Sequence, residues 1–301
     1  MPAPYREVRV LAPAKINLIL RVLDRRPDGY HNLWSLMQTV GLEDELRVRV
    51  RSGTAGVRLT CSSPDLPSDA RNLVVKAASL LLSHVEHAID VEVELTKRIP
   101  LGGGLGGGSS DAAATMMALN QLLDLGWPLS KLADQSAGLG SDVPFFFSAP
   151  TAIVAGRGGD VTPVSLAGER WIVLVNPGFA SDTKQAYQAL SARRTGVRPL
   201  SPAHERIGPG KRLSWDDVIP HMENDFEPAL APTYPILTEL KKELLNEGAE
   251  AAMLSGSGAT VFGVFRDEPS AREGCRTLGR RPGCFSEAVP SCRRPIECQN
   301  V

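Results

Sequence analysis

The residues best suited to chemistry are a run of glycines in the first half of the chain. Residues 98–114 read RIPLGGGLGGGSSDAAA, so glycine fills six of the seven positions 102–108. Glycine costs about 0.5–1 kcal/mol relative to alanine in ordered structure, so this many together require a reason. The two candidates are a flexible linker and a loop that wraps a ligand with its own N–H groups.

The surroundings of this glycine loop favour the second candidate. An alternating segment over 91–96 predicts a strand before the loop, and an alanine-rich segment over 111–125 predicts a helix after it. A helix N-terminus exposes unpaired N–H groups and a partial positive charge, which together favour phosphate. We therefore interpret the loop as a phosphate cradle.

The glycines alone are compatible with more than one type of phosphate-binding loop. The nucleotide P-loop pattern is absent, because no lysine follows the last glycine. A G-x-G-x-x-G match at Gly102, Gly104 and Gly107 keeps a nicotinamide oxidoreductase as a minority alternative, with Asp124 about where a ribose-binding acid would lie. The preceding strand carries two glutamates, whereas that alternative needs an apolar central strand.

A second candidate for chemistry is the pair Asp142 and Lys15. Asp142 lies between glycine and proline turns ahead of an apolar run, in GSDVPFFF, and Lys15 lies between Ala14 and Ile16. An aspartate can orient and deprotonate an acceptor hydroxyl, and an ammonium group can stabilise developing negative charge. The alternative is a structural ion pair without a catalytic role. The sequence does not show whether the two side chains meet.

The elements that must position these residues mix strands and helices. The patterns predict strands at 7–11, 16–23, 45–51, 91–96 and 171–175, helices at 72–83, 111–125, 130–138, 181–190 and 234–247, and a strand, glycine turn and strand over 252–264. Pro13 separates the first two strands, and residues 195–213 are expected to form an exposed excursion. Mixed elements without regular strand–helix alternation predict an α+β fold, with a domain boundary near 150–165.

Composition excludes several classes of function. The chain of 301 residues has a net charge of −1, so it lacks the basic field that nucleic-acid or membrane binding would use. It has no apolar run of about 18 residues and no secretory signal pattern, so we expect a cytoplasmic protein without a membrane partner. The five cysteines include no C-x-x-C pair, so no metal site is expected.

A series of motifs resembles the GHMP small-molecule kinases. Residues 100–113 are similar to the ATP-binding motif of that family. The other matching segments, in chain order, are PAKINL (13–18), PDGYH (27–31), GSDVPFF (140–146), NPG (176–178) with Thr183 and Tyr187, NDFE (224–227) and SGSGAT (255–260). Each motif is modest alone, but their common order makes the resemblance specific.

The resemblance implies both an architecture and a reaction. It implies a ribosomal-S5-like, ATP-binding N-terminal domain over 1–158 and a ferredoxin-like C-terminal domain over 159–301, with the active site in the cleft between them. It also implies that ATP, carrying Mg²⁺, phosphorylates the 2-hydroxyl of 4-diphosphocytidyl-2-C-methyl-D-erythritol, in the non-mevalonate pathway to isoprenoids. The alternative is a kinase of the homoserine or mevalonate type, which would lack the cytidine-reading segment 28–31. A monomer or a homodimer is expected.

The resemblance also assigns roles to individual residues. Lys15 and Asp142 would be catalytic. The ATP site would comprise Asn72, Leu73, Lys97, Pro100, Leu101, Gly102, Gly103, Gly104, Leu105, Gly106, Gly107, Gly108, Ser109 and Ser110. The acceptor substrate would contact Asn17, Tyr30, His31, Asp142, Thr183, Tyr187, Gly256 and Ser257. In this assignment the two tyrosines stack on the cytosine and His31 reads the edge of the base. Gly256 to Gly258 form a second anion-binding turn, and no dedicated acidic Mg²⁺ ligand is assigned.

Overall fold

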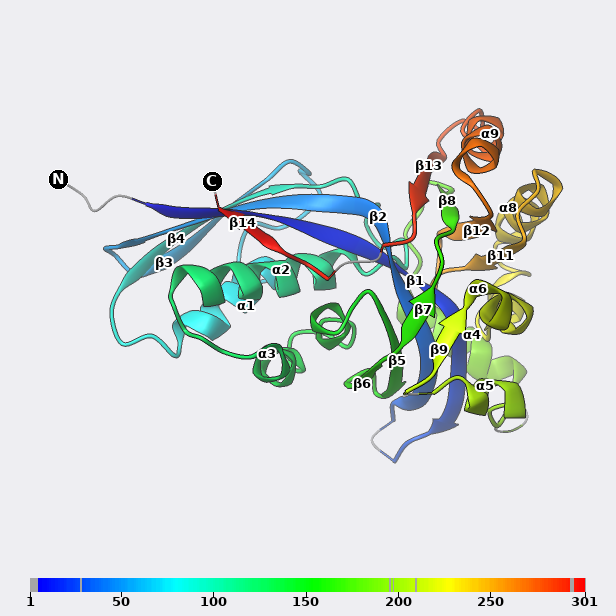
Figure 1. The fold of residues 1–301 in the computed structure, drawn as a ribbon, viewed down its shortest axis with the longest axis horizontal. Helices are drawn as coiled ribbons and strands as arrows, with labels where there is room; N and C mark the ends of the chain where they lie inside the picture. The colour runs from blue at the N-terminus through cyan, green and yellow to red at the C-terminus, as the bar shows by residue number, and fades with distance from the viewer. Residues whose placement is uncertain are drawn as a thin grey trace.

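The computed structural model describes residues 5–27, 29–194, 196, 198–208, 210–292 and 295–300. Asp28 of the PDGYH motif lies outside the described residues. The strands form one large sheet, one four-stranded sheet and one small pair (Figure 1). Helices cover one face of the large sheet and pack on the four-stranded sheet, so the predicted α+β fold is confirmed.

The large sheet is built on two long antiparallel strands, β1 (Arg6–Arg25) and β2 (His31–Ser52). Figure 1 shows both strands running from one half of the molecule into the other. The other strands of this sheet are β3 (Gly56–Cys61), β4 (Ile89–Thr96), β5 (Thr151–Gly156), β6 (Asp160–Pro163), β10 (Glu223–Asn224) and β14 (Cys298–Asn300). Since β4 pairs antiparallel with β2, the sheet is not the doubly wound parallel sheet of the dinucleotide-binding alternative.

Pro13 does not divide the first strand as predicted. Residues 7–11 and 16–23 belong to the single strand β1, and the register to β2 shifts between Pro13 and Ala14. Proline lacks a backbone N–H, so a bulge is one of the few places where a sheet accepts it. The proline therefore marks an irregularity within a strand rather than its end.

Four helical segments lie on one side of this sheet. They are α1 (Leu73–Leu82), α2 (Gly107–Leu122), α3 (Leu129–Ser136) and η1 (Pro144–Phe147). Helices α1 and α2 lie against its strands, and the other two segments pack on α2. The core between α1, α2 and the sheet consists of buried aliphatic residues together with the phenylalanines of η1. Helix α2 begins four residues before the predicted start at 111, because Gly107 and Gly108 adopt helical conformation after Gly106, which has a φ of +69°.

The four-stranded sheet is formed by the second half of the chain. Its order is β11 (Ala251–Leu254), β12 (Val261–Phe265), β8 (Trp171–Asn176) and β13 (Phe285–Pro290), with every pair antiparallel. Helices α8 (Pro235–Asn246) and α9 (Glu268–Leu278) pack on it. The remaining elements are β7 (Ser165–Ala167), α4 (Thr183–Arg193), α5 (Pro202–Arg206), β9 (Arg212–Ser214), α6 (Trp215–Val218), η2 (Ile219–His221) and α7 (Glu227–Leu230).

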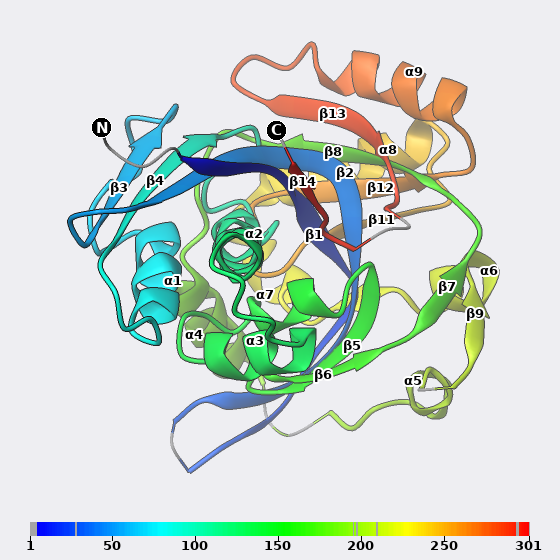
Figure 2. The same cartoon turned by 60° about the vertical axis from the view of Figure 1, so that its left-hand side comes forward.

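The two halves of the chain interlock. The proposed boundary between 158 and 159 falls in the turn that joins β5 to β6, and these two strands pair with each other. Strand β10 pairs with β1, and β14 returns from the end of the chain to pair with β1 as well (Figure 2). A cut at 158/159 would therefore divide the large sheet, although both halves have cores of their own.

Residues 195–213 are not simply an exposed excursion. His204 on α5 is 3% exposed, and its ring stacks on Trp34 with 5.8 Å between centroids. The apolar residues of this region were too sparse to predict this packing. Among the helices that the structure describes, none has both the length and the apolar character needed to cross a membrane.

Candidate functional site

The glycine loop joins β4 to α2 and is packed tightly against the second half of the chain. A Cβ atom at Gly104 would lie 2.1 Å from the Ser255 carbonyl oxygen, and one at Gly102 would lie 2.6 Å from the Ala180 Cβ. Both glycines also have positive φ, where other L-residues are strained. These glycines are therefore required by packing between segments as well as by a ligand.

Hydrogen bonds fix the orientation of the loop. The carbonyls of residues 102–105 accept, in order, from Ser181 N–H, Thr260 N–H, Ser255 Oγ and Lys15 N–H, at 2.9–3.2 Å. The C=O and N–H of a trans peptide point in opposite directions. The N–H groups of residues 103–106 therefore face away from these partners, as a phosphate cradle requires.

A cavity of about 370 Å³ lies along this loop. It is lined by Asn72, Leu73, Lys97 and every residue from Pro100 to Ser109, so the structure brings together nearly all of the predicted ATP-binding residues. Ser110 is the exception: it is fully buried, it is not part of the lining, and its Oγ has no hydrogen-bond partner among the described residues. Leu66, Pro67, Arg71 and Asp111 also line the cavity, although no sequence motif indicated them.

Lys97 lies at this cavity with its ammonium group between two carboxylates. Its Nζ binds Asp111 Oδ2 at 2.8 Å and also Asp44 Oδ2, and the Lys97 side chain is 5% exposed. Asp44 accepts through Oδ1 from the N–H groups of Arg98 and Ile99, at 2.6 and 3.0 Å. This cluster joins β2, the start of the loop and the first turns of α2. Sequence gave no signal for Asp44, which is distant along the chain.

Asp111 is the unusual member of this cluster. Burial raises the pKa of its carboxyl to about 7; Lys97 opposes the rise and Asp44 adds to it. Its Oδ1 is buried and has no hydrogen-bond partner in the part of the chain that the structure describes. Burial therefore favours the protonated form of this carboxyl relative to that of an exposed aspartate.

The structure brings Lys15 and Asp142 together. Lys15 Nζ lies 3.4 Å from Asp142 Oδ2; the Lys15 side chain is 4% exposed and that of Asp142 is 27% exposed. Lys15 Nζ also donates to Asn17 Oδ1 at 2.7 Å, and Asn17 donates through Nδ2 to Ser35 Oγ at 2.8 Å. The ammonium group is thus held from one side by Asn17, while Asp142 remains open to solvent.

The second glycine turn lies beside this pair. A Cβ atom at Gly256 would lie 3.4 Å from Lys15 Nζ and 3.1 Å from the Gly104 carbonyl oxygen. Ser257 Oγ is 2.9 Å from Thr183 Oγ1. Gly256 is therefore near Lys15, and the neighbouring Ser257 contacts Thr183, which lines the larger cavity described next.

A larger cavity, of about 1150 Å³, contains the other predicted substrate residues Tyr30, His31 and Tyr187. The rings of His31 and Tyr187 are stacked, with 5.0 Å between centroids and 16° between planes. Tyr30 is 58% exposed, and the Arg157 guanidinium lies 4.0 Å from its ring centroid. Burial, followed by Arg25 and Arg194, lowers the pKa of His31. A neutral imidazole can both donate and accept a hydrogen bond.

The lining of this larger cavity is also basic. Arg25, Arg157 and Lys184 contribute to it, and its described lining residues include no Asp or Glu. Ser141 and Gly140, which precede Asp142, belong to the same lining. Such a cavity favours an anionic ligand that ends near Asp142.

This chain belongs to the GHMP kinases, because both domains of that family match it and close relatives span nearly its whole length. The GHMP kinases N terminal domain matches residues 72–149, and the GHMP kinases C terminal domain matches residues 200–283. The chain is 39% identical over 284 residues to the 4-diphosphocytidyl-2-C-methyl-D-erythritol kinase of Citrifermentans bemidjiense, covering 94% of this chain and 99% of the relative.

Solved structures agree on the fold. A crystal structure of 4-(cytidine 5'-diphospho)-2C-methyl-D-erythritol kinase has a TM-score of 0.77 and 31% identity, with 93% of this chain and 98% of that chain covered. A homoserine kinase from Cytophaga hutchinsonii has a TM-score of 0.74 at 22% identity, with 97% of each chain covered. The second likeness shows the shared fold alone.

Proposed function

We propose that this chain transfers the γ-phosphoryl group of ATP to the 2-hydroxyl of 4-diphosphocytidyl-2-C-methyl-D-erythritol, as a kinase of the non-mevalonate isoprenoid pathway. The observation that carries the proposal is the Lys15–Asp142 pair and its position between two cavities. Lys15 donates its backbone N–H to Leu105 of the glycine loop, and Asp142 follows Ser141 of the larger, basic cavity. In this proposal the donor and acceptor sites would meet at one carboxylate and one ammonium group.

The reaction depends more on positioning and charge than on covalent help from the protein. The N–H groups of the glycine loop would hold the ATP phosphates at the N-terminus of α2. Asp142 would orient the acceptor hydroxyl and take its proton, while Lys15 would stabilise the charge that develops on the oxygen. The bond from Lys15 to Asn17 keeps the ammonium group in place during this step.

Mg²⁺ would enter this site with ATP, as part of the substrate. Serine hydroxyls are hard oxygen ligands of the kind that Mg²⁺ accepts beside phosphates and water. Ser109 lines the ATP cavity, so its hydroxyl fits a metal that is held mainly by phosphate oxygens. Ser110 follows it on α2 but is fully buried and outside the lining, so we assign no metal contact to its hydroxyl.

The cytidyl end of the substrate would occupy the larger cavity. Tyr30 and Tyr187 offer ring faces to the base, and stacking of this kind contributes about 1–3 kcal/mol per base. His31 would bind the edge of the base, and the basic residues of the cavity would attract the diphosphate. Asn17, Thr183, Gly256 and Ser257 would contact the erythritol end.

Two further properties go with this proposal. The protein would be located in the cytoplasm. The oligomeric state would be a monomer or a homodimer, with both cavities formed by a single chain, as the described lining residues are.

The test is an ADP-release assay with ATP, Mg²⁺ and the cytidyl substrate, with homoserine and mevalonate as alternative acceptors. We expect ADP release that depends on the cytidyl compound alone. Release with homoserine or mevalonate in its place would retain the kinase but overturn the proposed acceptor. A gain in thermal stability on adding ATP would report the donor site separately.

A further inference from the structure

The segment Asn224-Asp225-Phe226-Glu227 takes no part in the chemistry above, yet its side chains reach several elements of the site. Asn224 donates through Nδ2 to the carbonyls of Leu254 and Gly256, at 2.7 and 2.8 Å. Glu227 accepts from the Leu254 N–H at 2.7 Å. These contacts fix the strand that leads into the second glycine turn.

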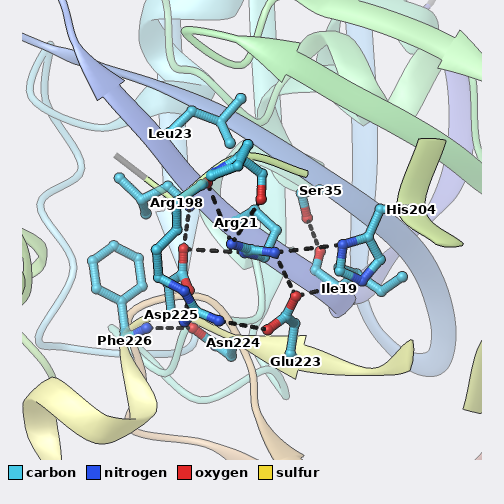
Figure 3. A network of polar contacts seen from close by, with 12 residues as sticks. Ile19, Arg21, Leu23, Ser35, Arg198, His204, Glu223, Asn224, Asp225 and Phe226 are labelled. Atoms are coloured by element: carbon cyan, nitrogen blue, oxygen red, sulfur yellow. Dashed lines mark hydrogen bonds and ion pairs between the residues drawn. The ribbon is translucent and has the colours of Figure 1, made fainter. Parts of the chain in front are cut away.

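Asp225 is the centre of a buried ionic network (Figure 3). Its Oδ2 accepts from the Val22 N–H at 2.8 Å, from Arg194 Nη2 at 2.6 Å and from Arg21 Nε at 3.3 Å. Its Oδ1 accepts from Arg198 Nη1 at 3.3 Å. One carboxylate therefore joins β1 to side chains from two other segments. Removing it would leave the Arg194 guanidinium, which is 15% exposed, without the carboxylate that it binds among the described residues, and a charge left unpaired in such a place is costly.

Arg194 connects this carboxylate to helix α4. It immediately follows the helix, and it also donates through Nη1 to the carbonyls of Val22 and Leu23. Helix α4 begins with Thr183 and carries Tyr187, which are both predicted substrate residues. The C-terminal end of the helix that presents the substrate residues is thus tied to β1 through Asp225 and Arg194.

Phe226 makes a second contact to the same helix. It is 3% exposed, and its ring meets the Tyr187 ring edge-on, with 4.9 Å between centroids and 89° between planes. Tyr187 in turn stacks on His31 of β2. Because Phe226 is buried behind Tyr187, it can set the position of this ring without offering an exposed face to a ligand.

We infer that Asp225 and Phe226 are positioning residues for the acceptor substrate: through Arg194 and the Tyr187 ring they hold α4 in the place where the cytidyl group binds. This inference rests on the proposed function. The described hydrogen bonds, ion pairs and ring contacts of these two residues do not include any residue that lines the ATP cavity. Their loss would therefore weaken acceptor binding and leave ATP binding intact.

The test compares Arg194→Ala with the matched control Arg198→Ala. Each change removes one arginine that binds Asp225. Only Arg194 directly follows the last residue of α4, and the Arg198 side chain is 59% exposed. A shifted helix misplaces its contacts with the ligand, so we expect Arg194→Ala to raise KM for the cytidyl substrate roughly tenfold or more. KM for ATP should match that of Arg198→Ala, whereas the thermal unfolding midpoint should be lower in Arg194→Ala, because this change also removes hydrogen bonds to the carbonyls of Val22 and Leu23. Equal KM values for the cytidyl substrate in the two variants would overturn the inference.

Phe226→Leu tests the second contact independently. Leucine keeps the site apolar but removes the ring edge, so KM for the cytidyl substrate should again rise while KM for ATP stays constant. A parallel rise in both KM values would indicate general loosening of the fold and would contradict the inference.

Binding of cytidine diphosphate, measured by calorimetry on the unaltered protein and each variant, separates this inference from the proposed function. If the unaltered protein binds this probe but does not phosphorylate the cytidyl substrate, the proposed function fails. The positioning inference then requires weaker probe binding by Arg194→Ala and Phe226→Leu than by Arg198→Ala. Absence of probe binding by the unaltered protein would overturn both.

Discussion

Lys15 and Asp142 differ in how far they are buried, and each environment suits the role proposed for that residue. The lysine is buried and hydrogen-bonded to Asn17, so its ammonium group is fixed before a substrate arrives. The aspartate is partly exposed and keeps an open side for a hydroxyl group. A fixed charge costs no reorganisation during the reaction, and this is the basis of electrostatic catalysis.

Asp142→Asn is therefore expected to lower kcat by about 10²- to 10⁴-fold, since the proton acceptor is lost while the shape is kept. ATP affinity, measured by calorimetry, should remain because the glycine loop is unchanged. Asp216→Asn, at a side chain that is 80% exposed, is the control. Turnover by Asp142→Asn at the rate of this control would remove Asp142 from the mechanism.

The buried carboxyl of Asp111 predicts a specific dependence of stability on pH. Its pKa is raised from 3.8 to about 7 in the folded chain, so between these values the folded state holds a proton that the unfolded state has released. The contribution of Asp111 to the free energy of unfolding then falls as pH rises through this window. Lys97, whose pKa is raised, titrates above it.

In Asp111→Asn this titration is absent, so urea unfolding at pH 5 and pH 8 should show a smaller loss of stability with pH than in the unaltered protein. Asp216→Asn should retain the original loss. An equal loss in Asp111→Asn would exclude Asp111 as its source.

At the level of elements, the glycine loop must both pack closely against other segments and direct its N–H groups to the opposite side. Its carbonyls bind residues of β1 and of the second half of the chain, and its N–H groups face the opposite side. The absence of a side chain at Gly104 allows the close packing, because a Cβ atom there would collide with the Ser255 carbonyl. The loop is therefore held rigidly although it is rich in glycine.

The variants Gly104→Ala and Gly108→Ala test the packing requirement. They compare the free energy of unfolding when alanine replaces a closely packed glycine and when it replaces a glycine with space around it. Alanine at 104 meets backbone 2.1 Å away at a φ of +77°, so we expect a loss of about 2 kcal/mol or more in the free energy of unfolding. Alanine at 108, within α2, meets only Leu73 Cδ1 at 3.7 Å and should be neutral or stabilising by up to about 1 kcal/mol. Urea denaturation measures both changes, and similar losses would contradict the packing role of Gly104.

At the level of the whole molecule, the end of the chain completes the sheet formed by its beginning. Strand β14 pairs with residues 8–10 of β1, and Ile296 just before it is 4% exposed in the N-terminal core. The residues of β14 line neither of the two cavities. They contribute to stability rather than to the reaction.

Deletion of residues 298–301 is expected to lower the free energy of unfolding by roughly 1–3 kcal/mol, because hydrogen bonds to β1 are lost. KM values for ATP and for the cytidyl substrate should not change. The uncovered edge of β1 should also increase aggregation on heating. A shortened chain with unaltered stability would show that β14 does not hold the sheet.

Local sequence patterns determined the α+β fold, the glycine loop and most of the regular elements. These depend on neighbours in the chain: alternation, helical periodicity and glycine content act over a few residues. The boundaries at Pro13 and residue 111 were wrong because a bulge and helical glycines depend on partner strands and packing. The family resemblance, rather than the patterns, selected ATP and the cytidyl substrate.

Only the tertiary structure brought Asp44 to Lys97, Phe226 to Tyr187 and three arginines to Asp225. Each contact joins segments whose separation in sequence carries no periodic signal, so local reasoning had no means to find it. The same holds for Lys15 and Asp142, which the sequence offered only as candidates. Their distance of 3.4 Å is set by the packing of β1 against the loop and the turn before η1, and not by either segment alone.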